Sequence, residues 1–311
     1  LLVWSGVTFA MGYAETFNQL YWLRALMGIS EALYIPAGLS LIADYHGSKT
    51  RSLAIGIHMT GLYMGQALGG FGATVAANFT WHTAFKSFGL IGLVYAFVLM
   101  LCLREKRQPV AETMVQPDGE SYGVPWYKGF ILLFSNISFW IILFYFAAPS
   151  LPGWGVKNWL PTLFAESLQI DMAEAGPLST ITIAVSSFLG VITGGILSDK
   201  WIQVNLRGRI FTSAIGLALT IPALLFIGFG SALWHVVAAA FCFGFGFGMF
   251  DANNMPIVCQ FVAPRLRGTA YGLMNMTGVF AGALVTNWLG KSQDAGSLGK
   301  DFAFLSAMVA V

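Results

Sequence analysis

The chain alternates long apolar runs with short polar segments, and this pattern sets its fold class. Most runs are about 20 residues long and lack the polar stripe that a surface helix of a soluble protein keeps. About 20 apolar residues is also the length that a helix needs to cross a bilayer. The pattern therefore predicts an all-α membrane protein. The runs that we expect to span are residues 20–45, 53–77, 84–103, 126–159, 178–198, 210–229, 233–262 and 269–289, with partial spans at 1–14 and 302–311.

Glycines and prolines refine this pattern. Gly61, Gly65 and Gly69 give the span 53–77 a face of small residues, which lets another helix come close. Gly190 and Gly194 form a similar face. In the run 126–159, prolines and glycines between residues 149 and 155 predict a break near one end, with a loop at 161–176. The alternating glycines Gly244, Gly246 and Gly248 follow no strand, so we interpret them as packing glycines rather than a nucleotide-binding loop.

Composition agrees with a membrane protein. Hydrophobic residues make up 57% of the chain and charged residues 10%, against about 25% charged residues in soluble domains. The net charge of +2 argues neither for nor against nucleic acid. No basic patch outside short loops could follow the phosphates, so we expect no nucleic-acid partner. Three cysteines lie in apolar runs without metal-ligand spacing, and no motif predicts a cofactor or metal. Because the chain begins and ends inside apolar runs, we expect a fragment of a longer protein.

The long hydrophilic stretch at residues 104–125 divides the chain. We predict a cytoplasmic linker between an N-terminal half, residues 1–103, and a C-terminal half, residues 126–311. Lys and Arg then gather in the loops on the linker side, as cytoplasmic loops require. The linker side holds Lys49, Arg51, Arg104, Lys106, Arg107, Lys128, Lys200, Arg207, Arg209, Arg265 and Arg267, against Lys157, Lys291 and Lys300 on the opposite side.

A distant internal repeat supports the two halves. Residues 24–56 and 240–272 share one plan, in which an apolar helix ends in a short basic loop and a second helix follows. Such a repeat indicates two structurally related bundles. At one constant offset, Gly28 aligns with Gly244, Lys49 with Arg265, Arg51 with Arg267, Ala54 with Ala270 and Gly56 with Gly272.

Ionisable residues inside spans are costly, so each is a functional hypothesis. Arg24 and Glu31 lie seven residues apart with Gly28 between them, on one helix face, with the charges roughly 10 Å apart along the axis. The alternatives are a structural ion pair and a role in binding or coupling. Asp251 lies with Asn253 and Asn254 before a proline, where polar groups beside a kink line a cavity or solvate the cytoplasmic end of the helix.

Weaker polar candidates lie in other spans. His58, Tyr63 and Gln66 share the span 53–77, where a lone histidine is more often a packing residue than a functional one. Asn136 and Tyr145 lie in the broken span, and Asn275 lies in the span 269–289. No hydrolase, zinc-protease, nucleotide-loop or paired-cysteine signature is present, so the sequence does not predict an enzyme.

Several segments resemble one family. Residues 24–37, with Arg24, Gly28, Glu31 and Pro36, resemble the fourth-helix motif of the major facilitator superfamily, most like its anion:cation symporter branch of hexuronate, glucarate and sialic-acid carriers. Residues 195–209 resemble the cytoplasmic loop between helices eight and nine, in which an acidic residue holds a basic partner and gates the inward side. Gln66 stands where the antiporter motif has a proline, which favours symport.

The resemblance implies a major facilitator-type bundle of two related halves and alternating access around a midplane site. About ten of the twelve helices would be present, without helices one and two and most of helix twelve. The candidate substrate-binding residues are Arg24, His58, Tyr63, Gln66, Asn136, Tyr145, Asn254 and Asn275, the candidate ion-coupling residues are Glu31 and Asp251, and the candidate gating residues are Asp199, Lys200, Arg207 and Arg209.

The function that follows is secondary active transport of a small organic anion such as a sugar acid. The expected partners are this anion, a coupling proton or sodium ion and the lipid bilayer. We expect a monomeric, multi-pass protein of an inner or plasma membrane. The alternatives are a sugar-phosphate/phosphate antiporter, which would want two arginines facing a phosphate, and a transporter-like sensor.

Overall fold

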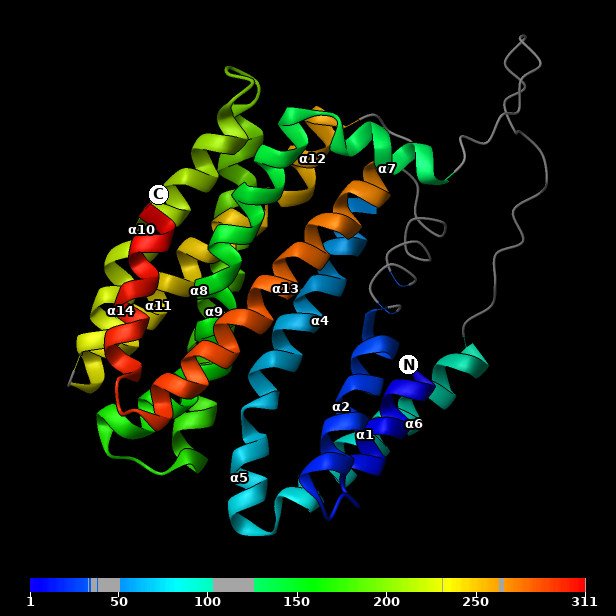
Figure 1. Ribbon diagram of the computed structural model, residues 1–311, viewed down its shortest axis with the longest axis vertical. Coiled ribbons are helices and arrows are strands. Elements are labelled where there is room, and N and C mark those ends of the chain that lie inside the picture. The colour runs from blue at the N-terminus through cyan, green and yellow to red at the C-terminus, as the bar shows by residue number, and fades with distance from the viewer. Residues whose placement is uncertain are drawn as a thin grey trace. The chain divides into compact units, whose positions relative to one another are not determined.

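The structure of the protein, a computed structural model, describes residues 1–32, 34, 38, 51–102, 126–230, 232–262 and 266–310. These residues form helices and no strand (Figure 1), which confirms the predicted all-helical class. The loop residues Lys49 and Arg265 and the linker 104–125 lie outside the described residues. The helices that are long and apolar enough to cross a membrane are Trp81–Cys102, Ile137–Leu168, Met172–Trp201, Gly208–Phe229 and Leu233–Phe261.

The chain divides into two compact units, of which the first comprises residues 1–65 and 71–121. In it, α1 packs against both α2 and α6, and α5 packs against α6. Gly89 and Gly92 of α6 meet Phe9 and Ser5 of α1, so the lack of side chains lets these two backbones approach. The described helices of this unit are α1 (Leu2–Met11), α2 (Phe17–Ala32), α4 (Arg51–Gly69, of which the last residues belong to the second unit), α5 (Phe71–Asn78) and α6 (Trp81–Cys102).

The second unit comprises residues 66–70 and 122–311. Within it α11 packs against α9 and α10, α13 packs against α8, and α14 packs against α10 and α8. Its further helices are α7 (Trp126–Phe134), α8 (Ile137–Leu168), α9 (Met172–Trp201), α10 (Gly208–Phe229), α11 (Leu233–Asp251), α12 (Asn254–Phe261), α13 (Arg267–Asp294) and α14 (Leu298–Ala310).

Glycines let the backbones of α9, α10 and α11 touch. A Cβ added at Gly194 of α9 would lie 2.7 Å from the Cα of Met249 in α11. Gly190 and Gly248 face backbone atoms of the opposite helix in the same way, and Gly216 of α10 faces Gly246 of α11. The small-residue face on 178–198 and the packing role of the glycines in α11 are therefore confirmed. By contrast, no described heavy atom lies within 4 Å of a Cβ built at Gly61, Gly65 or Gly69.

Two clusters of large apolar side chains fill the second unit between its helices. One contains Leu160 and Phe164 of α8, Leu224 and Ile227 of α10 and Phe302 of α14. The other, towards the opposite end of α8, contains Phe139, Val258 and Met274. Many large apolar side chains on the outside of the described helices are exposed, among them Phe226 at 61%. This distribution suits a bundle whose surroundings are lipid rather than water.

The break predicted between residues 149 and 155 is wrong. α8 runs without interruption from Ile137 to Leu168 through Pro149, Pro152 and Pro161, and the predicted loop 161–176 shrinks to the few residues before Met172. Prolines are tolerated in membrane helices because neighbouring groups satisfy the backbone atoms that they leave unbonded. The interruption instead falls before Asn136, which caps α8 by accepting a hydrogen bond from the Ser138 amide.

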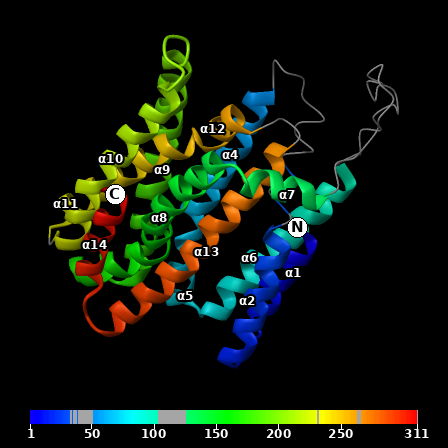
Figure 2. The ribbon, with the colours of Figure 1, turned by 45° about the horizontal axis from the view of Figure 1, so that its top comes forward.

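Two predicted spans are each built from two helices. Residues 53–77 divide at Gly70 into α4 and α5, and Gly70 lies against Gly176 and Thr180 of α9. Residues 233–262 divide after Asp251, where α11 ends and the shorter α12 begins at Asn254 (Figure 2). The predicted kink before Pro256 is thus a full interruption of the helix. The expected loops at 199–209 and 290–300 are also shorter, since α9 reaches Trp201, α13 reaches Asp294 and α14 begins at Leu298.

Candidate functional site

The end of α11 brings predicted site residues together. The ring of Tyr145 in α8 packs against Phe250, with 5.3 Å between the ring centroids. The Asn254 side-chain amide donates a hydrogen bond of 3.0 Å from Nδ2 to Oδ1 of Asp251. Asp251 itself is exposed, whereas Asn254 is 2% exposed. The interruption between α11 and α12 therefore places an exposed carboxylate in contact with a buried carboxamide.

Hydroxyl groups from two other helices, α8 and α13, lie near this carboxylate. The hydroxyls of Tyr145 and of Tyr271 in α13 lie within electrostatic range of Asp251, and Asn275 is the neighbour of Tyr271 one helical turn along. Ser213 of α10 lies beside Tyr145. We call this group the Asp251 cluster. It consists of Tyr145, Ser213, Asp251, Asn253, Asn254, Tyr271 and Asn275.

Several buried oxygen atoms of the Asp251 cluster have no hydrogen-bond partner among the described residues. They are the hydroxyl oxygens of Tyr145 and Ser213 and the Oδ1 atoms of Asn253 and Asn254. Asn253 is fully buried at 0% exposure, and its Nδ2 is already used in a hydrogen bond of 2.9 Å to the Met249 carbonyl. Leaving a buried polar atom unpaired costs about 1–3 kcal/mol, so this concentration of unpaired oxygens calls for a ligand or water.

A small cavity adjoins the Asp251 cluster. It has a volume of about 200 Å³ and is lined by Tyr145, by Ser138 and by apolar side chains of α8, α10 and α12. Ligand pockets for drug-sized molecules usually hold about 300–1,000 Å³. The volume of the cavity is therefore below that range and its lining is mainly apolar, and Tyr145 is the lining residue that it shares with the Asp251 cluster.

The candidate charges of the first unit do not pair with each other. Arg24 and Glu31 of α2 are both exposed, and neither belongs to an ion pair within the described part of the chain. The Arg24 guanidinium instead lies over the ring of Phe85 in α6, with 5.6 Å from Cζ to the ring centroid. A cation held on an aromatic face keeps its hydrogen-bond donors available. The structural ion pair that was one interpretation of these residues is not formed.

The remaining candidates of the span 53–77 lie in different surroundings. The His58 ring is 6.1 Å from the ring of Tyr34, and its Nε2 is buried without a partner among the described residues. Tyr63 is half-buried on the same helix. Gln66, in the second unit, lines a cavity of about 190 Å³ together with Lys157 and Thr180. Gln66 and Tyr145 thus line separate cavities.

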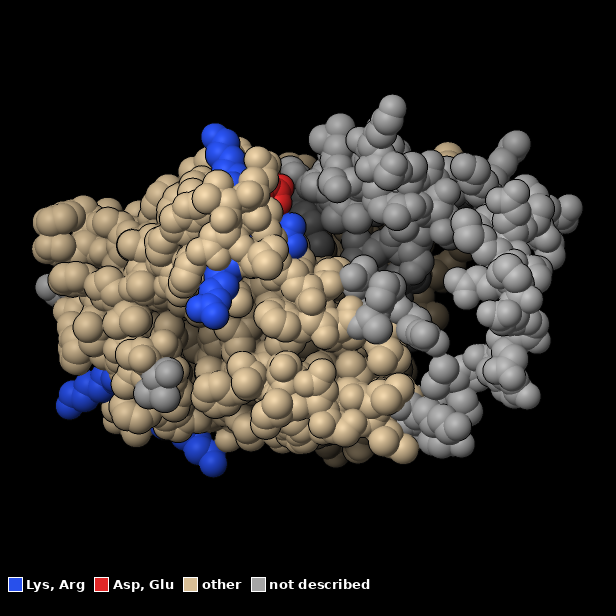
Figure 3. All heavy atoms as spheres, turned by 90° about the horizontal axis from the view of Figure 1, so that it is seen from above, with Lys and Arg blue, Asp and Glu red and all other residues tan. Residues whose placement is uncertain are grey.

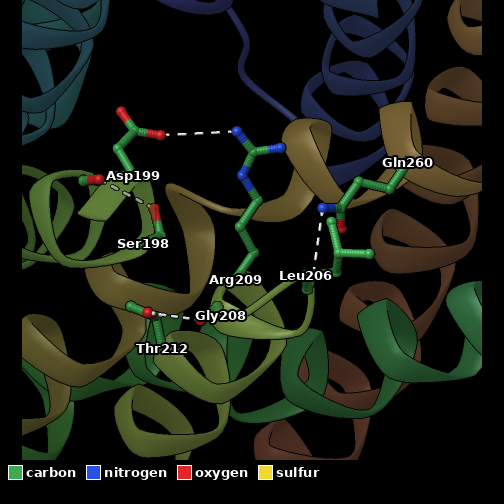
Figure 4. Close-up of polar contacts among 8 residues, drawn as sticks. Ser198, Asp199, Leu206, Gly208, Arg209, Thr212 and Gln260 are labelled. Atoms are coloured by element: carbon green, nitrogen blue, oxygen red, sulfur yellow. Dashed lines mark hydrogen bonds and ion pairs between the residues drawn. The ribbon is translucent and has the colours of Figure 1, made fainter. Parts of the chain in front are cut away.

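The candidate gating residues lie where α9 turns into α10, and two of them form an ion pair. Arg209 Nη2 lies 3.6 Å from Oδ1 of Asp199 (Figure 4), with the Arg209 side chain 22% and that of Asp199 74% exposed. Lys200 and Arg207 are exposed and take no part in that pair. Seen from above, the described surface is mostly uncharged, with a few basic side chains and a small acidic patch beside them (Figure 3).

Short-range contacts fix the geometry of this turn. Gly208 opens α10 against Trp201, and a Cβ at Gly208 would lie 2.6 Å from the Trp201 Cβ. The Gln260 side chain of α12 donates a hydrogen bond of 3.5 Å to the Leu206 carbonyl (Figure 4). The turn that carries the Asp199–Arg209 pair is therefore connected to α12, which begins at the Asp251 cluster.

The sequence missed two members of these sites. Tyr271 stands four residues before Asn275, so helical spacing could have indicated it. Ser213 lies in an apolar run and gives no signal, because its place beside Tyr145 is set by the packing of α10 on its neighbours. Lys157, which the sequence places on the side opposite the linker, is a cation beside the polar groups of the Gln66 cavity. Asn136 is a helix cap at the surface, and no candidate ligand group lies beside it among its described contacts.

Comparison with known proteins adds to this geometry. The chain is 26% identical over 319 residues to "Sodium-dependent phosphate transport protein 1, chloroplastic" of Arabidopsis thaliana, covering 94% of this chain and 59% of that protein. It is 26% identical over 297 residues to "Ascorbate transporter, chloroplastic" of Arabidopsis thaliana, covering 88% and 52%. It is 24% identical over 334 residues to "Probable anion transporter 3, chloroplastic" of Oryza sativa subsp. japonica, covering 99% and 62%. The chain thus spans between half and two thirds of these relatives.

A solved structure has the same fold. The bacterial homologue of the human lysosomal transporter Spinster, in its inward-facing and unoccupied conformation, superposes with a TM-score of 0.74 at 19% identity, over 99% of this chain and 78% of that one. At this identity the likeness concerns the fold alone. A family model described as Major Facilitator Superfamily matches residues 1–286. With its apolar helices, the chain is an integral multi-pass membrane protein, and it belongs to the Major Facilitator Superfamily.

Proposed function

We propose that the full-length protein is a secondary active transporter that carries a small organic anion together with a cation. The relatives support the anion, since their names specify phosphate, ascorbate or an unspecified anion. The observation that carries the proposal to this chain is the exposed Arg24 guanidinium, which no carboxylate neutralises among the described residues. A guanidinium presents a planar fork of donors that matches a carboxylate.

Arg24 and Glu31 then take complementary roles on one face of α2. Arg24 binds the carboxylate of the substrate, and Glu31 carries a proton. Because one guanidinium is present in α2, a carboxylate such as that of a sugar acid suits the site better than a phosphate. Gradient-driven symport is the mode that this pair supports. Two expectations from the sequence stay predictions. They are that the protein lies in an inner or plasma membrane and that it is a monomer.

A phosphate or sugar-phosphate exchanger is the second candidate. The observation in its favour is the similarity to a relative whose name specifies phosphate transport. The two candidates differ in what drives uptake. A symporter accumulates its anion when an inward proton or sodium gradient is imposed, whereas an exchanger needs a counter-anion inside the vesicle.

Proteoliposomes with the full-length protein test the proposal. We expect uptake of radiolabelled hexuronates or sialic acid under an inward cation gradient, with little uptake of phosphate. Arg24→Ala should reduce uptake at least about tenfold, which corresponds to the 1.5–3 kcal/mol of a charged hydrogen bond. Lys86→Met is the matched control, since Lys86 is a helix cation of the same unit that lies over the ring of Tyr13, 4.0 Å from its centroid. Uptake that needs internal phosphate would overturn symport in favour of exchange.

Glu31→Gln separates coupling from binding. A neutral amide of the same shape cannot release a proton, so we expect loss of accumulation under a proton gradient while exchange of labelled for unlabelled anion continues. If the variant still accumulates the anion against its gradient, Glu31 does not carry the coupling proton.

A further inference from the structure

We propose that the Asp251 cluster is a binding site for a monovalent metal cation, with sodium as its occupant. This inference rests on the proposed function and deepens it, because it adds a metal-cation site in the second unit to the proton-carrying role proposed for Glu31. It rests on the interruption between α11 and α12 and on the buried side-chain oxygens around it, none of which the proposed anion-binding role of Arg24 uses.

The residues at the interruption carry buried side-chain oxygen atoms. The Asn254 carboxamide is held against the Asp251 carboxylate by its hydrogen bond of 3.0 Å, so its own Oδ1 lies close to that carboxylate. The Oδ1 atom of Asn253 is also buried and without a partner among the described residues. Pro256 cannot supply the N–H that would normally bond the Ala252 carbonyl four residues earlier. Carbonyl groups at helix interruptions are typical sodium ligands in transporters.

The chemistry of the unpaired atoms favours a cation over water. Both asparagine amide nitrogens already donate, Asn253 Nδ2 to the Met249 carbonyl and Asn254 Nδ2 to Asp251. On both side chains the buried atom that has no partner among the described residues is the acceptor oxygen. Oxygen acceptors beside a carboxylate are the ligand set that hard cations select. The C-terminal end of α11 and the N-terminal end of α12 carry opposite partial charges, so the Asp251 carboxylate decides the sign of the local field.

The charge count indicates a monovalent ion. The Asp251 cluster contains one carboxylate, whereas calcium sites usually combine several carboxylates. A proton is a poorer match, because a protonated Asp251 offers a single O–H and leaves at least one of the two amide oxygens without a donor. The hydroxyls of Tyr145 and Ser213 lie beside each other in the same cluster and are further buried oxygens from α8 and α10. The ion would thus join α11 and α12 to their neighbours.

Direct sodium binding tests this assignment without any knowledge of the anion. The full-length protein is purified in detergent, and binding of ²²Na⁺ is measured in choline chloride at constant ionic strength. We expect saturable binding to the unmodified protein. Asn254→Leu should weaken it by more than the roughly 10- to 100-fold that loss of an outer-shell partner costs. Asn254→Asp, which keeps the oxygen, should retain binding and shows that position 254 tolerates substitution.

Asn158→Leu is the matched control. It removes a carboxamide from α8 in the same unit, where Asn158 Nδ2 donates to Thr286 Oγ1 in a hydrogen bond of 2.9 Å, and should leave sodium binding unchanged. Absence of sodium binding in the unmodified protein, or wild-type binding by Asn254→Leu, would overturn the assignment. Equal loss in Asn158→Leu would also overturn it, since it would show a general loss of structure. If sodium binds but no anion is taken up, the proposed function fails while the cation site stands.

Discussion

The substitution Gly194→Ala probes the contact between α9 and α11. The added Cβ would lie 2.7 Å from the Cα of Met249 and 3.0 Å from its carbonyl oxygen. Non-bonded carbon atoms prefer separations of about 3.5–4.0 Å, so the two backbones must move apart by about 1 Å. Overpacking of this kind costs about 1–3 kcal/mol. The contact is between backbones, and no side-chain rotation relieves it.

Gly195→Ala is the adjacent control on the same helix. No described heavy atom lies within 4 Å of a Cβ built there, so the change should only improve helix propensity, by about 0.5–1 kcal/mol. Their effects on stability have opposite signs, so the two variants should differ in stability by about 1.5–4 kcal/mol. Thermal unfolding of the full-length protein in detergent, followed by tryptophan fluorescence, measures both. Gly194→Ala unfolding at or above the temperature of Gly195→Ala would refute the close contact.

Three further substitutions, two of them compared with a control variant, test other features. Phe164→Ala should lower the free energy of unfolding of the second unit by about 2 kcal/mol, because in lipid the cost comes chiefly from a cavity of about 100 Å³. Its control, Phe226→Ala at an exposed position, should change the unfolding temperature little. Asp199→Asn should change the free energy of unfolding by no more than about 1 kcal/mol, because Asp199 is 74% exposed. If the ion pair with Arg209 gates the inward side, this variant should change anion uptake far more than the unfolding temperature. Gly296→Ala, at a φ of +68°, should destabilise by about 1 kcal/mol, with Gly296→Asn closer to wild type in the same melting assay.

The membrane fold was predictable because lipid imposes a simple rule on composition and run length. The runs around Gly190, Gly194 and the glycines of α11 also gave a correct packing prediction, since small residues in membrane helices have few other uses. Pro149, Pro152 and Pro161 misled, because a proline interrupts a helix only where neighbouring groups do not satisfy the freed carbonyl. Sequence spacing cannot supply that information.

The sequence predicted which residues belong to the candidate site better than it predicted how they are arranged in space. Asp251 and Asn254 stood out because polar residues in apolar runs are rare. That Tyr145 and Ser213 accompany them follows from how α8 and α10 pack around α11, which periodicity does not encode. The roles of Arg24 and Glu31 stay predictions, as do the gating roles of Asp199, Lys200, Arg207 and Arg209.

Backbone contact along α9, α10 and α11 has a mechanical consequence. Helices whose backbones touch at glycines interlock, so they cannot slide past one another without first separating. These three helices must therefore move together as one rigid body. Any bending within the second unit then has to occur in segments outside α9, α10 and α11. α8, with its three prolines, and the interruption after Asp251 are the places where such bending is cheapest.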